Sequence, residues 1–299
     1  MIELDGNYGE GGGALVRVAL ALSTLMGKEF KVTNIRAGRE QGGLKAQHLT
    51  AIKALKEITG AETNEIDLGS TELYFKPGKF KRGMYEIDIG TAGSITLLLQ
   101  ALILPALFAS AKVTLKIKGG TCGKWQASVD YLQLVLLPQL QRFAGRIELK
   151  ILKRGYYPAG GGEVVVEISP KYSITKFVNL ETFLEEIKFK VQKIDLVNKG
   201  RLEQIRGVVN VSVELADRDI AERIVRATES ALKKYGVPIQ IRVDYGKSQS
   251  IGGEILLYAI YSNNGKIDFT NPIIVGADVL LDKSKSSEEI GKEAAKKLI

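Results

Sequence analysis

Residues 5–13 read DGNYGEGGG and run directly into ALVRVALAL at residues 14–22. A short apolar strand is expected just before them, at residues 2–4. Glycines let backbone amides approach a ligand closely, and the N-terminus of the following helix adds partial positive charge. The stretch therefore predicts a strand, a loop that holds an anion such as phosphate, and a buried helix. A glycine-rich turn that only packs the helix against a sheet is the alternative.

Two charged residues favour a functional loop. The carboxylate of Glu10 would repel phosphate unless a divalent cation lay between them, so the loop suggests a metal-nucleotide site or a general base. Arg17 lies one turn into an otherwise apolar helix, where an unpaired guanidinium would be costly to bury. The cost of burying Arg17 makes a structural turn the weaker interpretation.

The composition is that of a soluble globular protein. The chain has 299 residues, 45% hydrophobic and 25% charged, enough for one large domain or two smaller ones. Lys and Arg number 42 against 34 Asp and Glu, and the resulting net charge of +8 permits a polyanionic partner. The single cysteine, Cys122, excludes an internal disulfide and fits a reducing cytoplasm. The most apolar run, residues 95–111, contains Gln100 and Pro105 and predicts a core helix, so no membrane association is expected.

One pattern occurs twice in the chain. The order strand, glycine loop, apolar helix and strand at residues 2–35 returns at residues 85–117, and Asp5 corresponds to Asp88, 83 positions later. Each copy continues with a second helix that ends before a glycine, and then with a strand. A repeat of this length is typical of a small α/β module that is used more than once. The helices are expected at residues 14–26, 47–59, 95–110 and 129–144.

A third copy is expected to begin at residues 157–168 and to be interrupted. From about residue 184 the sequence alternates predicted strands with a charged amphipathic helix at residues 219–234. Residues 286–289 read SSEE and predict the N-cap of a last helix that reaches Leu298. The expected division is a large repeat domain at 1–183, with repeats at about 1–80, 81–155 and 156–183 plus 275–299, and a small domain inserted at 184–274.

Two familiar nucleotide-binding motifs compete with this interpretation. Residues 246–248 read GKS like the end of a P-loop, but Ile241 stands where that loop requires glycine, which excludes it. Residues 9–14 have the spacing of a dinucleotide-binding fingerprint, and Arg36 is placed to meet a 2′-phosphate, so a nicotinamide-dependent oxidoreductase is a further function class. Glu10 within the loop, and the extra helix and strand that end each repeat, argue against it.

Basic and amide side chains gather after the second predicted strand. Arg36, Arg39, Lys45, Gln47 and His48 fall within thirteen positions. Two arginines with amide and imidazole donors at a strand-to-helix junction suit bidentate phosphate binding. A solvated basic loop is the better explanation of any one of these residues, but the cluster as a whole predicts an anion site.

Taken in order, the motifs of this chain resemble those of the RNA 3′-terminal phosphate cyclase family. The resemblance runs from residue 1 to about residue 170 and resumes near Val275. It implies an α/β (α+β) fold with a large domain of three repeated α/β modules, each like the C-terminal domain of a bacterial translation initiation factor, and a small α/β domain inserted in the third. The motifs are DG at 5–6, GEGGG at 9–13, IRAGR at 35–39, QHLTA at 47–51, GS at 93–94 with Gln100, GGT at 119–121 and GYYPAGGG at 155–162.

The resemblance implies an ATP-dependent conversion of an RNA 3′-terminal phosphate to a 2′,3′-cyclic phosphodiester. In the family, a histidine attacks the α-phosphate of ATP, AMP passes to the RNA 3′-phosphate, and the neighbouring 2′-hydroxyl displaces AMP. By position, Glu10 resembles the ligand of a divalent metal, Mg or Mn. The partners implied are ATP and an RNA 3′ end in the cytoplasm, and a homodimer is left open. The implied nucleotide and phosphate contacts are Arg17, Arg36, Arg39, Gln47, His48 and Gln100.

The sequence departs from the family at two places. The family's nucleophilic histidine and an Asp-Gln pair that contacts the nucleotide are expected beyond Ile299. Where the family has a proline-rich stretch against the adenine, residues 122–128 read CGKWQAS, so Trp125 is the expected adenine platform. With His48 as its only histidine, a chain ending at Ile299 is expected to bind ATP weakly and to form no covalent AMP adduct. The alternative function is a non-catalytic, cyclase-like RNA-binding protein in ribosome maturation, although a scaffold has no need of Glu10.

Overall fold

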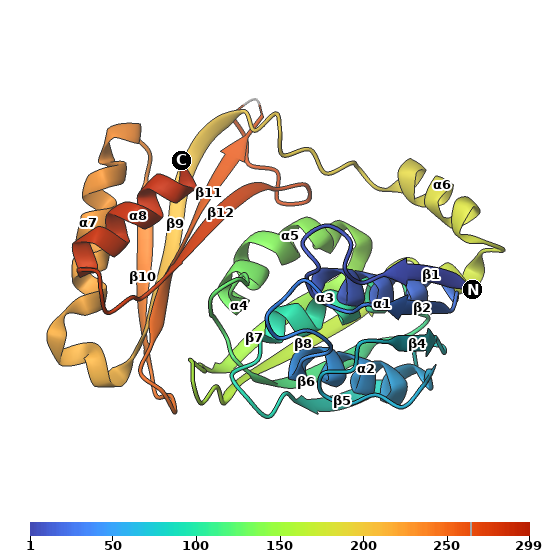
Figure 1. Ribbon diagram of the computed structural model, residues 1–299. Coiled ribbons are helices and arrows are strands. Elements are labelled where there is room, and N and C mark those ends of the chain that lie inside the picture. Colours follow the sequence, from blue (N-terminus) through green and yellow to red (C-terminus); the bar gives the residue numbers. More distant parts are fainter. Residues whose placement is uncertain (264) are drawn as a thin grey trace.

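The part of the chain that the structure describes forms three four-stranded sheets with helices packed against them. Figure 1 shows the computed structural model, which describes residues 1–263 and 265–299. Two sheets lie close together with their helices, and the third stands beside them with two helices of its own (Figure 1). The expected α/β fold class is thereby confirmed.

The first unit contains the glycine-rich loop. Its elements are β1 (Ile2–Asp5), α1 (Ala14–Met26), β2 (Phe30–Thr33), α2 (Ala46–Thr59), β3 (Glu62–Thr63) and β4 (Leu73–Lys76). The sheet order is β1-β2-β4-β3, with β1 and β2 parallel and the other neighbours antiparallel. Helix α1 has the predicted bounds and ends at Gly27, whose φ of 66° closes the helix in a left-handed turn.

The second unit has the same strand order and directions as the first. Its elements are β5 (Gly83–Asp88), α3 (Ile95–Leu107), β6 (Val113–Gly119), α4 (Val129–Tyr131), α5 (Leu137–Leu140), β7 (Ala144–Lys153) and β8 (Gly162–Pro170). The sheet order is β5-β6-β8-β7. The single helix expected at 129–144 is instead broken by a π-helical turn at Leu132–Leu136, next to Pro138, which has no N–H to continue the helical hydrogen bonds.

The third unit is a sheet of order β10-β9-β11-β12. Its elements, with the preceding helix, are α6 (Leu180–Lys190), β9 (Arg201–Ser212), α7 (Ile220–Leu232), β10 (Ile239–Gly246), β11 (Gly253–Ser262), β12 (Ile273–Leu280) and α8 (Ser287–Leu298). The predicted cap of α8 is confirmed, because Ser286 and Glu289 form a reciprocal capping box. Strand β8 pairs within the second sheet and β12 within the third. The three-fold repeat and the domain bounds at 183 and 274 stay predictions.

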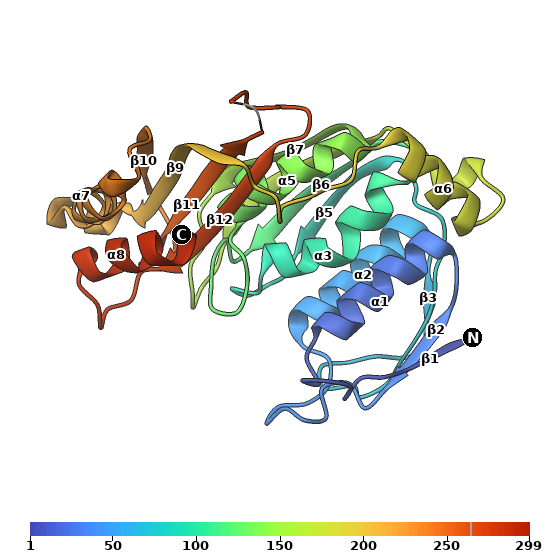
Figure 2. The ribbon, with the colours of Figure 1, turned by 90° about the horizontal axis from the view of Figure 1, so that it is seen from above.

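The first two units share one hydrophobic core. Figure 2 shows α1, α2 and α3 side by side between the first and second sheets. The run predicted as a core helix is α3, in which Leu98, Leu99 and Leu102 have no exposed surface. A second core lies between the third sheet and helices α7 and α8. In the part of the chain that the structure describes, no helix has both the length and the apolar character needed to span a bilayer.

A buried polar network joins the second and third units. Arg154 donates to both carboxylate oxygens of Asp130, with Nη2 to Oδ1 at 3.0 Å. Tyr156 donates its hydroxyl to Asn210 Oδ1 at 2.8 Å, and Asn210 Nδ2 donates to Glu254 Oε1 at 3.0 Å. Burial above all, and then the charge of Asp130, raises the pKa of Glu254 well above its ordinary value and so favours the neutral carboxyl. The network fixes how the third unit faces the second.

Candidate functional site

The glycine loop leaves the start of α1 open to a ligand. Gly13 occupies the N-cap position and offers no side chain to the first N–H groups of the helix. A Cβ atom on Gly13 would lie 2.3 Å from His48 Nε2 and 3.0 Å from Arg17 Nη1. Because no real Cβ tolerates the shorter distance, glycine is required at position 13 for these two side chains to sit beneath the loop.

Arg17 is buried, as expected, and its partner lies on another unit. Only 7% of Arg17 is exposed, and its Nε donates to Oε1 of Gln100 at 2.8 Å, which links α1 to α3. Burial, followed by the nearby charge of Arg36, lowers the pKa of Arg17. Within the described residues, the side chains that contact the guanidinium by hydrogen-bonding atoms are Gln100 and His48, and neither is an acid. Its charge is therefore free to meet an anion.

His48 is a fully buried, neutral ring. The backbone N–H of Lys45 donates to Nδ1 at 3.0 Å, so Nδ1 carries no proton and the proton of the neutral ring sits on Nε2. Burial first, and then the charges of Arg17, Arg36 and Lys45, lowers the pKa of His48 to about 4. The same hydrogen bond completes the N-terminal cap of α2. His48 thus lies in the first turn of α2 and adds no further positive charge to those of Arg17, Arg36 and Lys45.

The geometry of His48 gives a physical reason for the expectation that it is not adenylylated. A nucleophilic imidazole must present a lone pair to phosphorus. The lone pair of Nδ1 accepts the Lys45 N–H, and the protonated Nε2 lies under Gly13, 3.4 Å from Arg17 Nη1. His48 therefore packs beside Arg17 without a hydrogen bond to it, because both facing nitrogens carry protons. A direct contact between His48 and a nucleotide stays a prediction.

Arg36 has an unusual backbone and an unpaired donor. Its φ is 58°, in the left-handed region that long side chains rarely adopt. Nη2 donates to the carbonyl of Gln41 at 3.2 Å, whereas Nε is buried and lacks a hydrogen-bond partner in the described part of the chain. Burial, and then the charge of Arg39, lowers the pKa of Arg36. A buried donor without an acceptor among the described residues is able to bind an added one, such as a phosphate oxygen.

Glu10 and Arg39 form an exposed ion pair across the loop. Arg39 Nη2 lies 3.3 Å from Glu10 Oε2, and the two side chains are 46% and 92% exposed. Exposed pairs of this kind are weak, so either partner is free to exchange for a ligand. The described residues contain no group of three or more His, Cys, Asp or Glu side chains placed to hold a metal ion. A single carboxylate fits magnesium that is bound mainly by nucleotide phosphates and water.

Gln47 and Trp125 line one cavity of about 660 Å³, which we call the inner cavity. Gln47 lies in the first turn of α2, whereas Trp125 belongs to the loop after β6. The φ of Trp125 is 66°, and 96% of the residue is exposed. Residues of all three units line the inner cavity, including Ser94 of the second and Gly252 of the third.

The structure gathers the predicted residues into adjoining groups. Arg17, Gln100 and His48 form one group next to Gly13 of the glycine loop. Glu10 pairs with Arg39, which lies next to Gly12. Gln47 follows in sequence and opens onto the inner cavity, with Trp125 on its wall. The close approach at Gly13 and the place of Tyr157 on the same wall were not expected from the sequence. The GYYPAGGG motif was the available signal for Tyr157.

Comparisons with known proteins agree with these residues. A family model described as RNA 3′-terminal phosphate cyclase matches residues 8–269. Proteins named RNA 3′-terminal phosphate cyclase from Methanopyrus kandleri, Ignicoccus hospitalis and Saccharolobus islandicus (strain M.14.25 / Kamchatka #1) are 40%, 38% and 39% identical to this chain. The alignments cover 100% of this chain and 79%, 78% and 80% of the respective relatives. The chain therefore belongs to the RNA 3′-terminal phosphate cyclase family.

Proposed function

We propose that this protein uses ATP to convert an RNA 3′-terminal phosphate to a 2′,3′-cyclic phosphodiester through adenylylated intermediates. The observation that carries the proposal is the buried Arg17, fixed by Gln100 and without an acidic partner among the described residues. It lies close enough to Arg36 for one charge to lower the pKa of the other. Two guanidinium groups beside an open helix N-terminus suit a strongly anionic substrate such as ATP or an RNA phosphate.

The buried residues suit phosphoryl chemistry because they are preorganised. The bond to Gln100 fixes the guanidinium plane of Arg17, so its remaining N–H groups need little reordering as charge develops on a phosphate oxygen. The neutral ring of His48 packs beside the guanidinium without adding a further positive charge. Arg36 contributes an Nε donor whose acceptor we propose to be a phosphate oxygen.

We further propose that Glu10 holds a divalent cation, Mg or Mn, against the nucleotide phosphates. The cation supplies charge neutralisation between the carboxylate and the phosphates. Glu10→Gln is then expected to weaken ATP binding in the presence of magnesium and to leave metal-free ATP binding nearly unchanged, as measured by isothermal titration calorimetry. Equal losses with and without magnesium would assign Glu10 a structural role.

The inner cavity is the proposed site of the nucleotide base. Its volume of about 660 Å³ is in the range of small-molecule sites, and Gln47 and Trp125 offer an amide and an aromatic face. The free, buried thiol of Cys122, in the same wall, fits the proposed action in a reducing cytoplasm. A homodimer stays a prediction, and analytical ultracentrifugation would test it.

The direct test uses RNA that is labelled at its 5′ end and carries a 3′-phosphate. With ATP and magnesium, and with the nucleophilic histidine that the family resemblance places beyond Ile299, the product is expected to resist phosphatase, whereas RNA with a 3′-hydroxyl stays unchanged. Arg17→Lys keeps the charge but loses the fork that Gln100 orients, so we expect at least about a tenfold fall in kcat. RNA binding without any cyclised product would instead favour the non-catalytic, cyclase-like role.

ATP labelled on its α-phosphate tests the role of His48. We expect the amount of protein-bound AMP that survives denaturation to be the same in the wild type and in His48→Asn. Label that disappears in His48→Asn, while the variant still binds ATP, would make His48 the nucleophile.

A further inference from the structure

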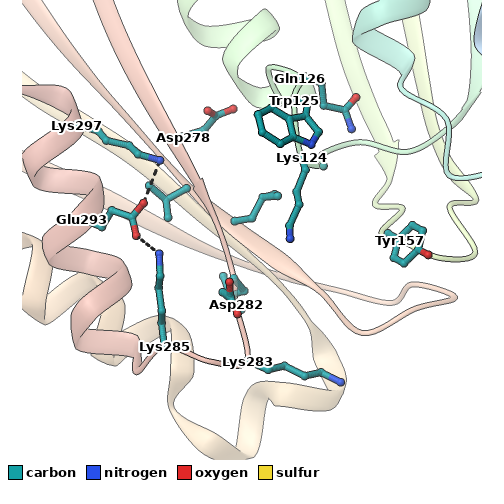
Figure 3. A pocket seen from close by; sticks show the side chains of 14 residues that line it. Lys124, Trp125, Gln126, Tyr157, Asp278, Asp282, Lys283, Lys285, Glu293 and Lys297 are labelled. Carbon is teal, nitrogen blue, oxygen red and sulfur yellow. Dashed lines mark hydrogen bonds and ion pairs between the residues drawn. The ribbon is translucent and has the colours of Figure 1, made fainter. Parts of the chain in front are cut away.

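A second cavity adjoins the inner one. Its volume is about 820 Å³, and we call it the outer cavity (Figure 3). It opens between the loop after β6 and the segment that leads from β12 into α8 (Figure 3). The side chains of Lys124, Trp125 and Tyr157 line both cavities. Because the two cavities share a wall, an extended ligand bound in the outer cavity is able to reach into the inner one.

The acidic side chains of the outer cavity are already engaged. Glu293 is shared by Lys285, at 2.6 Å, and Lys297, at 3.1 Å. Asp282 accepts hydrogen bonds from the backbone and hydroxyl of Ser284. Four lysines line the cavity against three carboxylates, so the lining has a formal charge of +1. The full set is Lys124, Lys283, Lys285, Lys297, Asp278, Asp282 and Glu293.

Two lysines remain available to a ligand. Lys124 and Lys283 are exposed, and neither has an ion pair or a side-chain hydrogen bond to another residue that the structure describes. Figure 3 shows Lys124 extending from its loop into the space in front of Asp282. Each ammonium group keeps its N–H donors for an anion, and the two come from different units, on opposite sides of the cavity.

An exposed aromatic ring stands beside these lysines. Tyr157 is 80% exposed, although it follows the buried Tyr156 in the loop between β7 and β8. Its ring is free for stacking, since no described hydrogen bond holds its hydroxyl. Aromatic faces beside cationic side chains are the usual surface for a single-stranded nucleic acid, because every base has a face to stack and every link a phosphate.

We propose that the outer cavity holds the single-stranded end of the substrate RNA. Lys124 and Lys283 contact its backbone phosphates, Tyr157 stacks on a base near the end, and the terminal phosphate passes into the inner cavity. This inference rests on the proposed function, because it locates the RNA of that reaction. It leaves the phosphates of ATP to the arginines beside the glycine loop, which line neither cavity, so the terminal phosphate of the RNA meets the nucleotide in the inner cavity.

Filter binding of a 3′-phosphorylated single-stranded RNA to the full chain, over a series of KCl concentrations, tests the proposal. Lys124→Ala/Lys283→Ala is expected to weaken binding about tenfold and to lower the slope of log K against log [KCl] by about 0.7 for each lysine. Tyr157→Ala is expected to weaken binding about tenfold at every salt concentration without a change in slope. Lys176→Ala and Phe189→Ala are the matched controls, exposed residues outside both cavities, and leave binding unchanged.

The affinity of the same variants for ATP, measured by calorimetry, separates this inference from the proposed function. In Lys283→Ala alone, whose side chain lines the outer cavity and not the inner one, weaker RNA binding with unchanged ATP binding supports it. Unchanged RNA affinity and salt slope in the three cavity substitutions, in a protein that still cyclises RNA, overturns the inference alone. A parallel loss of ATP and RNA binding in Lys283→Ala overturns it as well, because that lysine then serves the nucleotide. A wild type that neither cyclises RNA nor prefers a 3′-phosphate overturns the proposed function too.

Discussion

At the scale of single residues, the site depends on how closely Gly13, Arg17 and His48 approach one another. Each has a conventional local role, as a helix N-cap, a helical side chain and the cap of the next helix. They matter to the site because they touch one another: Gly13 has no side chain, and the side chains of Arg17 and His48 fill the space that one would occupy. Substitutions here are expected to affect binding and stability together.

Gly13→Ala is expected to destabilise the fold and weaken ATP binding. The added Cβ would lie 2.3 Å from His48 Nε2, so the ring must move and its packing beside Arg17 is disturbed. The cost of such overpacking is about 1–3 kcal/mol, which thermal and urea denaturation would measure.

Gly12→Ala is the matched control for Gly13→Ala. A Cβ at Gly12 would meet Arg39 Nη2 at 3.7 Å, an ordinary contact at the end of a flexible side chain. Stability is therefore expected to stay near the wild-type value. Equal losses in both variants would show that the loop backbone, and not the contact with His48, is the sensitive feature.

His48 is expected to make the protein acid-sensitive. Its pKa is about 4 in the folded chain against the ordinary 6.5, so the unfolded chain binds more protons between these values. Stability from this group is complete above pH 6.5 and is lost as pH falls toward 4, by about 3 kcal/mol at pH 4.

His48→Asn removes this titration and keeps an acceptor for the Lys45 N–H. Urea denaturation at pH 7 and pH 4 should show a smaller loss in the variant than in the wild type. The same loss in both proteins would place the acid sensitivity in other groups, such as the carboxylates.

At the scale of elements, local sequence predicted what local forces determine. The bounds of α1 follow from uninterrupted apolar residues after the glycines, and the cap of α8 follows from Ser286 and Glu289. The π-helical turn at Leu132–Leu136 was missed, although Pro138 was its visible cause. The cap of α8 and the π-helical turn each lie within a few residues of the sequence signal for them. The helix at 129–144 was therefore predicted in the right place, and only the way in which it accommodates Pro138 was not.

The contacts that build the site could be predicted only in part. The resemblance named Arg17 and Gln100, but nothing in the sequence paired them across 83 positions, because that pairing depends on how α1 packs against α3. The sequence shows which residue types are present, whereas the contacts between distant residues depend on the tertiary structure.

The ion pair of Asp130 and Arg154 lies within the second unit, but Arg154 also bonds to Asp244 and Asp130 to Asn210 of the third, so the pair tests the junction between the two units. Arg154→Met leaves the fully buried Asp130 charged and unpaired, and the expected loss of stability is about 3–5 kcal/mol. Arg146→Met breaks an exposed pair with Glu148 and is expected to leave stability nearly unchanged. Thermal denaturation of the two variants side by side measures the difference, and similar melting temperatures would contradict a structural role for the buried pair.

At the scale of the whole molecule, two cores are held together by a polar junction. One core serves the first two units and the other serves the third. A third, small cluster, which includes Val135 and Leu256, packs the helical turns before β7 against β11. Residues 191–200, which connect α6 to β9, contain no helix or strand. A protease is therefore expected to cleave the chain at this connection, while the polar junction keeps the two resulting fragments associated.

Limited trypsin digestion tests this organisation. Lys193 and Lys199 are exposed within residues 191–200, and cleavage is expected there before the cores are attacked. The two fragments should migrate together on native size exclusion, because the junction holds them, and separate in a denaturing gel. Early cleavage within α7 or α3, or fragments that separate under native conditions, would contradict the arrangement.

The exposed loop that carries Trp125 has an optical consequence. The chain contains one tryptophan, and 96% of it is in contact with solvent. Its emission therefore arises from a single indole in water on the wall of both cavities, without a background from buried indoles. A stacked adenine or RNA base would quench or shift that emission, so the unmodified protein reports the occupancy of its own site in a cuvette, at each step of a titration.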